Sequence, residues 1–350
     1  MSRQSLQIEL AERPVGDVIP GKTFRQITIT APTEADLKDG ELLLENLYLS
    51  LDPAMRGWLE DKRSYVPPVK IGEVMRGYAI CRVLASKSSK AKTGDIVTGL
   101  IGFAEVRILP EDGVEVLPLP PKAKITDLLG VLGVTGLTAY FGMTKIGLPK
   151  AGETVVVSAA AGATGSVAAQ IAKIAGARVV GTAGSDEKVR WLKEEMGLDV
   201  ALNYKDPDFQ RKFKEATPKF IDVFFDNEST VGGEQLDLAL ARANMFSRFV
   251  ICGGISQYNA KEKKGPTNFL SVISQRITIK GFIVFDYAAE YGAAREQLAQ
   301  WLSEGKLQRK ETIIKGGLKV SEDVMNYLFH GKNIGKLLLE VKNPDQQSKL

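Results

Sequence analysis

One stretch decides the fold of this chain: residues 154–165, which read Thr154-Val155-Val156-Val157-Ser158-Ala159-Ala160-Ala161-Gly162-Ala163-Thr164-Gly165. The β-branched run at 154–158 predicts a buried strand. A Gly-rich turn follows it directly, and after the turn Val167, Ile171 and Ala175 fall on one face of a helix. Strand, Gly-rich turn and helix together form the context that a dinucleotide-binding fingerprint requires.

Each glycine of this turn has a physical reason. Gly162 lets the backbone approach a pyrophosphate, and Gly165 lets the helix pack closely against the strand. The helix N-terminus offers backbone N–H groups and the positive end of its dipole to phosphates. Ala160 stands where the first glycine is usual, which is tolerable if its φ stays negative. The turn therefore predicts a bound dinucleotide.

Strands and helices alternate on both sides of this motif. Helical patterns cover 128–142, 165–175 and 186–195. We predict strands at 154–158, 178–182, 201–203, 221–225, 249–252 and 277–284. Buried strands separated by helices are typical of a parallel, doubly wound sheet in an α/β domain.

The first part of the chain has a different pattern. From about residue 6 to 125 it reads as short strands, such as 41–48, 78–84 and 95–99, broken by Gly, Pro and Asp. This pattern predicts a barrel-like β domain. The segment from about 305 to 342 is mixed again, and we expect it to fold back on the first domain.

The end of the strand that follows the Gly-rich turn and its helix distinguishes NADPH from NADH. An NAD enzyme usually carries an acid there, which binds the ribose 2′-hydroxyl. Here 178–182 runs into Ala183-Gly184-Ser185, and Lys188 follows one helical turn later. Ser185 and Lys188 would bind a 2′-phosphate, whereas Asp186 and Glu187 open a helix as dipole partners. The pattern favours NADPH.

The residue count excludes a zinc enzyme. A catalytic zinc needs Cys and His ligands, and a structural zinc needs four clustered cysteines. The chain has two distant cysteines, Cys81 and Cys252, and a single histidine, His330. We expect no metal, and we expect His330 to be a surface or interdomain side chain. The chemistry must then come from the nicotinamide, because no Ser-His-Asp or Cys-His pairing supports hydrolysis.

Bulk properties narrow the function further. The chain has 350 residues, a length that fits about two domains, and a formal net charge of +4. Its lysines are scattered without interleaved aromatic residues, so we expect no nucleic-acid partner. No apolar run is long enough for a membrane helix, and no signal segment opens the sequence. The two cysteines suit a reducing compartment.

The last residues carry a separate signal. Ser348-Lys349-Leu350 matches the peroxisomal address, which an import receptor reads from a flexible C-terminus. The preceding 343–347 segment is polar, and we expect it to be unfolded. We therefore predict a peroxisomal enzyme of eukaryotic origin, with the cytoplasm as the alternative.

The sequence resembles a known family over nearly its whole length, from Leu49-Ser50-Leu51-Asp52-Pro53-Ala54-Met55-Arg56 to Asn333-Ile334-Gly335-Lys336. The most specific segments are 184–188, 203–205, 225–227 and 252–259. They resemble the zinc-free medium-chain dehydrogenases/reductases, namely the leukotriene 12-hydroxydehydrogenase/prostaglandin reductases and alkenal double-bond reductases.

This resemblance implies a fold, a dimer and a set of cofactor contacts. It implies a GroES-like barrel at 1–127, a Rossmann domain at 128–300, and a segment at 301–350 that returns to the first domain. It further implies a cleft between the domains for nicotinamide and substrate, and a homodimer joined through the last Rossmann strand, 277–284. The implied NADP contacts are Gly162, Ala163, Thr164, Gly165, Ser185, Lys188, Tyr204, Asn227, Cys252, Gly253, Gly254, Ile255, Ser256, Gln257, Tyr258, Phe282, Ile283, Val284 and Asn333.

Physical reasoning supports some of these contacts more than others. Asn227 and 252–254 follow buried strands, at the edge where open parallel sheets bind ligands. Lys188 and Tyr204 could hold the 2′-phosphate. Phe282 and Val284 are explained equally well by core packing.

The reaction implied by the resemblance is reduction of the carbon–carbon double bond of an α,β-unsaturated aldehyde or ketone. NADPH would deliver hydride to the β-carbon, and a hydroxyl from Tyr258 or the cofactor ribose would stabilise the enolate. Tyr78 matches a pocket tyrosine, and Tyr258 could alternatively be a loop aromatic that packs over the cofactor. Two other family tyrosines are replaced by Ala54 and Ser274, which suggests a roomier pocket.

Two alternatives stay open. The hydride acceptor could be a quinone or a simple ketone, because the site would be nearly the same. The chain could instead be a non-catalytic NADPH-binding accessory protein; Tyr78 and Tyr258 argue against that hypothesis. Arg56 also matches a family arginine, for which a domain-bridging salt link is the simpler explanation.

Overall fold

A computed structural model describes residues 3–227, 233–259 and 265–345, and the chain divides into two compact units. Unit 1 comprises residues 1–129, 311–332 and 337–350, and unit 2 comprises 130–310 and 333–336. The expected boundaries were 127 and 300. Unit 2 thus extends to Lys310 and includes four residues, Asn333–Lys336, of the returning segment.

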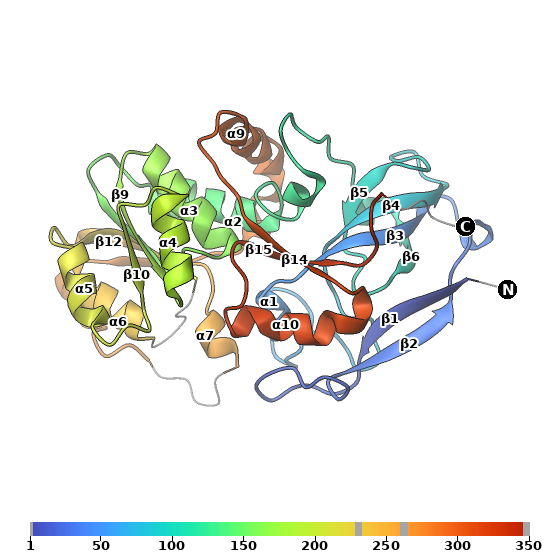
Figure 1. Ribbon diagram of the computed structural model, residues 1–350, viewed down its shortest axis with the longest axis horizontal. Coiled ribbons are helices and arrows are strands. Elements are labelled where there is room, and N and C mark those ends of the chain that lie inside the picture. The colour runs from blue at the N-terminus through green and yellow to red at the C-terminus, as the bar shows by residue number, and fades with distance from the viewer. Residues whose placement is uncertain (1–2, 228–232, 260–264, 346–350) are drawn as a thin grey trace. The chain divides into compact units, whose positions relative to one another are not determined.

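Unit 2 is built on a six-stranded parallel sheet (Figure 1). Its strand order is β10-β9-β8-β11-β12-β13, the doubly wound arrangement in which the chain reverses direction between β8 and β11. The strands are β8 Thr154–Val157, β9 Arg178–Ala183, β10 Val200–Asn203, β11 Ile221–Asp226, β12 Ala243–Ile251 and β13 Thr278–Gly281. The predicted α/β fold is therefore confirmed.

Helices precede, connect and follow these strands. They are α2 Val134–Phe141, the π-helix η4 Gly142–Gly147, α3 Ala163–Ile174, α4 Asp186–Glu194, α5 Phe209–Ala216, α6 Glu234–Ala241, α7 Ile255–Tyr258, α8 Ser271–Ser274, the 3₁₀ helix η5 Val284–Glu290 and α9 Tyr291–Ser303. The last strand was predicted to span 277–284, which is wrong in extent, because the chain leaves the sheet after Gly281 and turns into η5.

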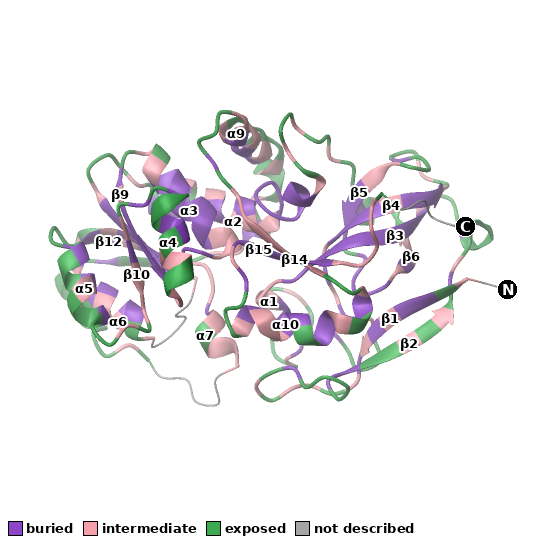
Figure 2. Cartoon of the chain, in the orientation of Figure 1, coloured by how far each residue is buried: buried purple, intermediate pink, exposed green. Residues whose placement is uncertain are grey.

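Strands β8, β9 and β11 of unit 2 are almost wholly buried because both faces of the sheet are covered there (Figure 2). Alternate side chains point to opposite faces. Val156, Phe224 and Phe249 join a core with α5 and α6. Toward the opposite face, Phe225 lies against Gly142 of η4. Burial on both faces explains the β-branched and aromatic runs that were visible in the sequence.

Unit 1 is mainly β-structure. Its strands are β1 Gln4–Leu10, β2 Phe24–Thr30, β3 Glu41–Ser50, β4 Ala79–Ser86, β5 Ile96–Gly99, β6 Val106–Pro110, β7 Val114–Glu115, β14 Glu311–Lys315 and most of β15 Lys336–Glu340. Its helices are α1 Ala54–Trp58, α10 Ser321–Phe329 and the 3₁₀ turns η1 Glu34–Asp36, η2 Glu111–Gly113, η3 Ile125–Leu128 and η6 Leu318–Val320.

The expected barrel is not closed among the described residues. Seven strands form one sheet, in the order β14-β15-β3-β4-β5-β7 with β6 also paired to β3, while β1 and β2 form a separate pair. β1 pairs with β2, and its other pairings among the described residues are the isolated bridges Gln7–Ala104 and Glu9–Val74. Because these bridges do not extend into ladders, the ring of strands stays open.

A buried carboxylate anchors the end of the described chain. Glu45 is 1% exposed and lies 2.5 Å from both Arg3 Nη2 and Lys342 Nζ. Arg82 donates to the carbonyl of Pro344, and the Asp345 N–H donates to Asn343 Oδ1 at 2.9 Å. The expectation of an unfolded 343–347 segment is therefore wrong for 343–345. The Ser348-Lys349-Leu350 signal lies outside the described residues.

Candidate cofactor and active site

The Gly-rich turn joins β8 to α3 within unit 2. The positive φ falls on Ala159, at 46°, and not on Ala160, so alanine is tolerated where the first glycine was expected. The Ala160 N–H donates to the Thr182 carbonyl of β9 at 2.9 Å, which fixes the turn against the sheet. Gly162 caps α3, and Gly162, Ala163 and Thr164 are only half-buried. Their backbone is thus placed at a helix N-terminus, where phosphates bind.

Gly165 is required by space. A Cβ at this position would lie 2.3 Å from the Ala159 carbonyl oxygen and 2.9 Å from Ala160 Cα. Both are backbone atoms, which cannot move aside without breaking the turn. At Gly162 the corresponding Cβ would lie 3.2 Å from the Ala159 oxygen, a much milder contact. The two glycines therefore have different roles, one in packing and one in leaving the backbone open.

A polar cluster joins the carboxyl ends of β8 and β11, where the sheet reverses direction. Ser158 is fully buried; its hydroxyl donates to Asp226 Oδ1 at 3.0 Å and accepts from the Asn227 N–H at 2.8 Å. The Asn227 side-chain amide donates to the Ser158 carbonyl at 2.9 Å. Asn227 is therefore held rigidly at the edge where ligands of doubly wound sheets bind.

The loop after β12 lies beside this cluster. The N–H groups of Cys252 and Gly253 donate to the Asp226 carbonyl at 2.9 and 3.1 Å, and the Ile255 N–H donates to the Asn227 carbonyl at 3.3 Å. A Cβ on Gly253 would lie 3.4 Å from that Asn227 oxygen. Burial, and then the charge of Asp226, raise the pKa of the Cys252 thiol to about 12, so this thiol stays neutral.

Tyr258 ends the short helix α7 in the same loop. Its hydroxyl oxygen accepts from the Gly254 N–H at 3.3 Å, a contact that uses an oxygen lone pair and not the hydroxyl hydrogen. Of the neighbouring predicted contacts, Gln257 donates its N–H to the Gly254 carbonyl, whereas Ser256 is exposed. The loop thus folds back on itself and places a phenol near Gly253 and Gly254.

A second group of predicted contacts gathers at the ends of β9 and β10. The Ser185 hydroxyl caps α4 by accepting from the Lys188 N–H at 3.3 Å. The Tyr204 N–H donates to the Ala183 carbonyl at 3.0 Å, and the Tyr204 ring lies over Gly184. Ser185, Lys188 and Tyr204 are all half-buried. A serine, a lysine and a tyrosine brought together in this way can bind a phosphate.

The returning segment 333–336 lies directly beside the Gly-rich turn. The Gly335 N–H donates to the Ala161 carbonyl at 2.8 Å, and Gly335 pairs with Gly162 in an isolated bridge. Asn333 is buried, and its amide donates to the Gly335 carbonyl at 2.9 Å. Gly335 was missing from the predicted site. Its φ of 66°, and a Cβ position 1.8 Å from the Lys310 oxygen, require glycine.

The segment Phe282–Val284 packs in the interior of unit 2. The Phe282 ring approaches Gly142, where a Cβ would meet its Cζ at 2.8 Å, and it meets Tyr287 with ring centroids 6.5 Å apart. Val284 is buried. Ile283 is half-buried and precedes η5. These contacts show that Phe282 and Val284 take part in packing, and the NADP contact of this segment stays a prediction.

Tyr78 belongs to unit 1, where it precedes β4 and is half-buried. Its carbonyl accepts from the Ser50 N–H at 2.8 Å. Arg56 is buried, and its guanidinium binds the Pro14 and Gly16 carbonyls and Glu60. All of these partners belong to unit 1, so Arg56 anchors a local loop in place of the expected domain-bridging link.

Neither metal nor membrane features emerge from the described part of the chain. Residues 3–227, 233–259 and 265–345 contain no group of three or more His, Cys, Asp or Glu side chains that could hold a metal ion. His330 is exposed in unit 1, with Nε2 3.3 Å from the Asp17 carboxylate. Within the same ranges, every helix is too short or too polar to cross a membrane.

Comparisons with known proteins cover nearly the whole chain. Residues 6–117 match a family model described as "N-terminal domain of oxidoreductase", and residues 163–303 match one described as "Zinc-binding dehydrogenase". The chain is 43% identical to the putative NADP-dependent oxidoreductase YfmJ of Bacillus subtilis, over 98% of this chain and 100% of the relative. It is 39% identical to the NADPH-dependent curcumin reductase of Escherichia coli, over 96% of each chain.

Further similarity comes from a plant enzyme and a solved structure. The chain is 38% identical to a NADP(+)-dependent 2-alkenal reductase of Nicotiana tabacum, over 86% of this chain and 87% of the relative. The crystal structure of CurA from Vibrio vulnificus in complex with NADPH superimposes with a TM-score of 0.89 and 38% identity. That superposition covers 97% of this chain and 100% of CurA.

Proposed function

The chain belongs to the zinc-free medium-chain dehydrogenase/reductase family, and on that premise we propose that it reduces the carbon–carbon double bond of α,β-unsaturated aldehydes and ketones with NADPH. The oxidoreductase class and the cofactor follow from membership and from relatives of this identity. The proposal that the hydride acceptor is a conjugated double bond is more specific than the oxidoreductase class. One observation carries it: a phenol, Tyr258, is held in the loop that follows β12.

The residues of unit 2 fit NADPH. Gly253 is a position where a Cβ would fill the space beside the Asn227 carbonyl and the Tyr258 hydroxyl. Gly162, Ala163 and Thr164 would hold the pyrophosphate, and Ser185, Lys188 and Tyr204 the 2′-phosphate. When bound, the nicotinamide supplies hydride for the β-carbon of the substrate, and uptake of a proton from water at the α-carbon completes the reduction.

The protein's part is to stabilise charge. As hydride arrives at the β-carbon, negative charge develops on the substrate carbonyl oxygen. The Tyr258 hydroxyl accepts from the Gly254 N–H, which holds the phenol oxygen beside the loop that follows β12. A hydrogen bond from this phenol would be strongest to the enolate oxygen, and hence in the transition state. Tyr78 is proposed as a second hydroxyl contact for the substrate.

An acceptor panel tests this function. Purified protein with NADPH or NADH is offered an enone, a quinone and a saturated ketone, and nucleotide oxidation is followed. We expect the enone to be reduced with a preference for NADPH, and the product to be the saturated carbonyl. Turnover of the ketone alone would refute the proposal, and turnover of the quinone alone would reassign the acceptor. NADPH binding without any turnover would favour an accessory role.

We also propose that the chain forms a homodimer through β13. All four β13 residues, Thr278–Gly281, are exposed at the edge of the sheet. Met245, Phe246 and Ile273 nearby are 60%, 67% and 74% exposed, which is unusual for large apolar side chains of a lone subunit. An unpaired edge strand beside such a patch favours pairing with a second copy.

The dimer is tested by a matched pair of substitutions. Ile279 of β13 is 38% exposed, and Ile313 of β14 is 37% exposed. Light scattering after gel filtration should give a dimer for the wild type and for Ile313→Asp, and a monomer for Ile279→Asp. A dimer that survives Ile279→Asp with unchanged dissociation would contradict an interface at this edge.

We propose a peroxisomal location from Ser348-Lys349-Leu350. An N-terminal fluorescent fusion expressed in a eukaryotic cell should colocalise with a peroxisomal marker. Deletion of the last three residues should leave it in the cytoplasm. Punctate fluorescence that survives the deletion would refute this signal.

A further inference from the structure

Tyr204 occupies space that only a glycine at 184 leaves open. A Cβ on Gly184 would lie 2.7 Å from the Tyr204 hydroxyl oxygen and 3.0 Å from its Cζ. The φ of Gly184 lies outside the left-handed region, so the backbone does not require glycine there. What requires it is the phenol of Tyr204, which directly follows β10 and lies against Gly184, the residue after β9.

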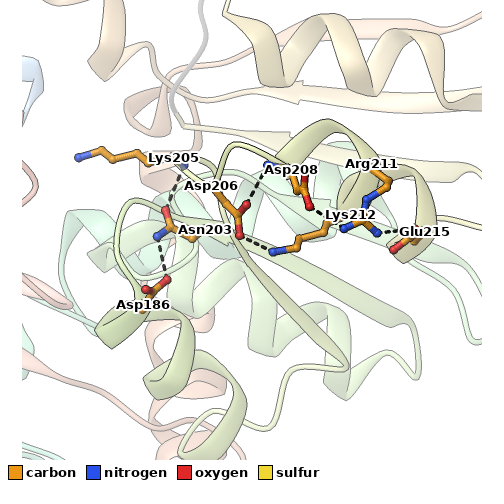
Figure 3. A network of polar contacts seen from close by, with 8 residues as sticks. All are labelled: Asp186, Asn203, Lys205, Asp206, Asp208, Arg211, Lys212 and Glu215. Atoms are coloured by element: carbon orange, nitrogen blue, oxygen red, sulfur yellow. Dashed lines mark hydrogen bonds and ion pairs between the residues drawn. The ribbon is translucent and has the colours of Figure 1, made fainter.

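Asn203, the residue before Tyr204, forms a hydrogen bond with the Asp186 carboxylate (Figure 3). The Asn203 side-chain amide donates to Asp186 Oδ1 at 2.9 Å, and its carbonyl accepts from the Lys205 N–H at 3.0 Å. Asp186 is the first residue of α4, directly after the capping residue Ser185. Asn203 thus links the end of β10 to the start of α4 through Asp186. This acid is the neighbour in sequence of Ser185, which belongs to the predicted 2′-phosphate site.

We propose that Gly184 and Asn203 are positioning residues that set the preference of this protein for NADPH over NADH. The proposal rests on the cofactor assignment made above, and deepens it. Gly184 admits the Tyr204 phenol to the 2′-phosphate site. Asn203 binds the Asp186 carboxylate and so fixes where this negative charge lies relative to the phosphate site.

The physical basis lies in charge. A 2′-phosphate carries nearly two negative charges and forms strong hydrogen bonds with lysine and hydroxyl donors. A carboxylate nearby repels it, whereas the same carboxylate can accept from the 2′-hydroxyl of NADH. Removing the Asn203 amide therefore works against NADPH and not against NADH. A side chain at position 184 would displace the Tyr204 hydroxyl, a hydrogen-bond donor that contacts the 2′-phosphate of NADPH and has no counterpart contact in NADH.

The first experiment substitutes Gly184→Ala and measures dissociation constants of NADPH and NADH by fluorescence titration. We expect the NADPH constant to rise about tenfold, as for loss of one hydrogen bond to a charged group. The NADH constant and the melting temperature should change little, because the displaced atom is the end of a side chain. Gly292→Ala is the control, since nothing lies within 4 Å of that Cβ position.

The second experiment is a rescue. Asn203→Ala should raise the NADPH constant about two- to fivefold, the range that exposed charges contribute. Asn203→Ala combined with Asp186→Ala should restore it, because the repelling carboxylate is gone. Asn244→Ala is the matched control. The Asn244 amide also donates to an aspartate, Asp222, at 2.8 Å, but at the end of the sheet where the parallel strands begin. That variant should leave the NADPH/NADH ratio unchanged.

The outcomes separate two failures. If Lys188→Met and Tyr204→Phe leave NADPH binding unchanged, the assigned phosphate site is wrong. If those two variants weaken NADPH but Gly184→Ala and Asn203→Ala do not change the NADPH/NADH ratio, the positioning role alone is refuted. Equal weakening of both nucleotides, or no rescue by Asp186→Ala, would also overturn it, because a purely structural role would act in that way.

Discussion

The parallel sheet of unit 2 has one end where its strands begin and another where they finish, and polar residues differ between these two ends. At the end where strands begin, charged groups pair with one another: Arg248 lies 2.6 Å from Glu153, and Asp222 accepts from the Thr154 N–H and from the Asn244 amide at 2.8 Å each. At the end of the sheet where strands end, glycines, hydroxyls and amides such as Gly162, Ser158 and Asn227 are buried or half-buried.

This difference identifies the end that binds a ligand. Pairs such as Arg248–Glu153 satisfy themselves and hold strands together. At the other end, Ser158 and Asn227 bind one another, which fixes the end of β11 against the residue that opens the turn after β8. Substitutions where the strands finish should therefore change nucleotide binding, and substitutions where the strands begin should change only stability.

The largest effect is expected for Gly165→Ala. The new Cβ would lie 2.3 Å from the Ala159 oxygen, so the turn must deform. We expect measurable NADPH binding to disappear and unfolding to become easier by about 2 to 3 kcal/mol. Nucleotide titration and urea denaturation check this. Gly162→Ala, with its contact at 3.2 Å, should fold normally; equal behaviour of the two variants would refute the distinction.

Lys188→Met should have the next largest effect. Loss of the cation should raise the dissociation constant of NADPH roughly tenfold to a hundredfold, with little change for NADH. Lys193→Met, on an exposed residue in the last turn of the same helix, is the control. A similar loss of both nucleotides would contradict a specific contact with the 2′-phosphate.

Asp222→Ala tests the end where the strands begin. It removes the acceptor of the Thr154 N–H, and Thr154 is 2% exposed, so a buried donor loses its carboxylate partner. We expect the free energy of unfolding to fall by about 1 to 3 kcal/mol, with the NADPH constant unchanged. A change in NADPH affinity without loss of stability would contradict the claim that residues where the strands begin affect only stability.

The smallest effect concerns pH and Asp199. Burial opposes its ionisation, but the Val179 N–H and Lys173, 2.9 Å away, lower the pKa of this carboxyl below its usual value. A lowered pKa contributes stability above about pH 4 that is lost as pH falls through the folded value. Asp199→Asn should therefore cost under about 1 kcal/mol at pH 7 and less at pH 3, as measured by urea denaturation. An equal cost at both pH values would contradict this.

Local patterns made much of unit 2 predictable. The run 154–158 and the turn at 160–165 follow from β-branched side chains, the absence of Cβ atoms and hydrogen bonds within a few residues. The end of the last strand could not be placed, because leaving the sheet after Gly281 depends on packing of Phe282 against Gly142. The open sheet of unit 1 likewise depends on pairings between distant strands.

By itself, the sequence determined the doubly wound domain, the nucleotide turn, the absence of a cysteine–histidine ligand set and the acid-free strand end with Lys188. Only the tertiary structure decided that the positive φ falls on Ala159, that Gly335 meets Ala161, and that Gly184 makes room for Tyr204. The first group depends on residues a few positions apart. The second depends on atoms that folding brings together across many residues, where a change of one Cβ decides whether two segments can meet.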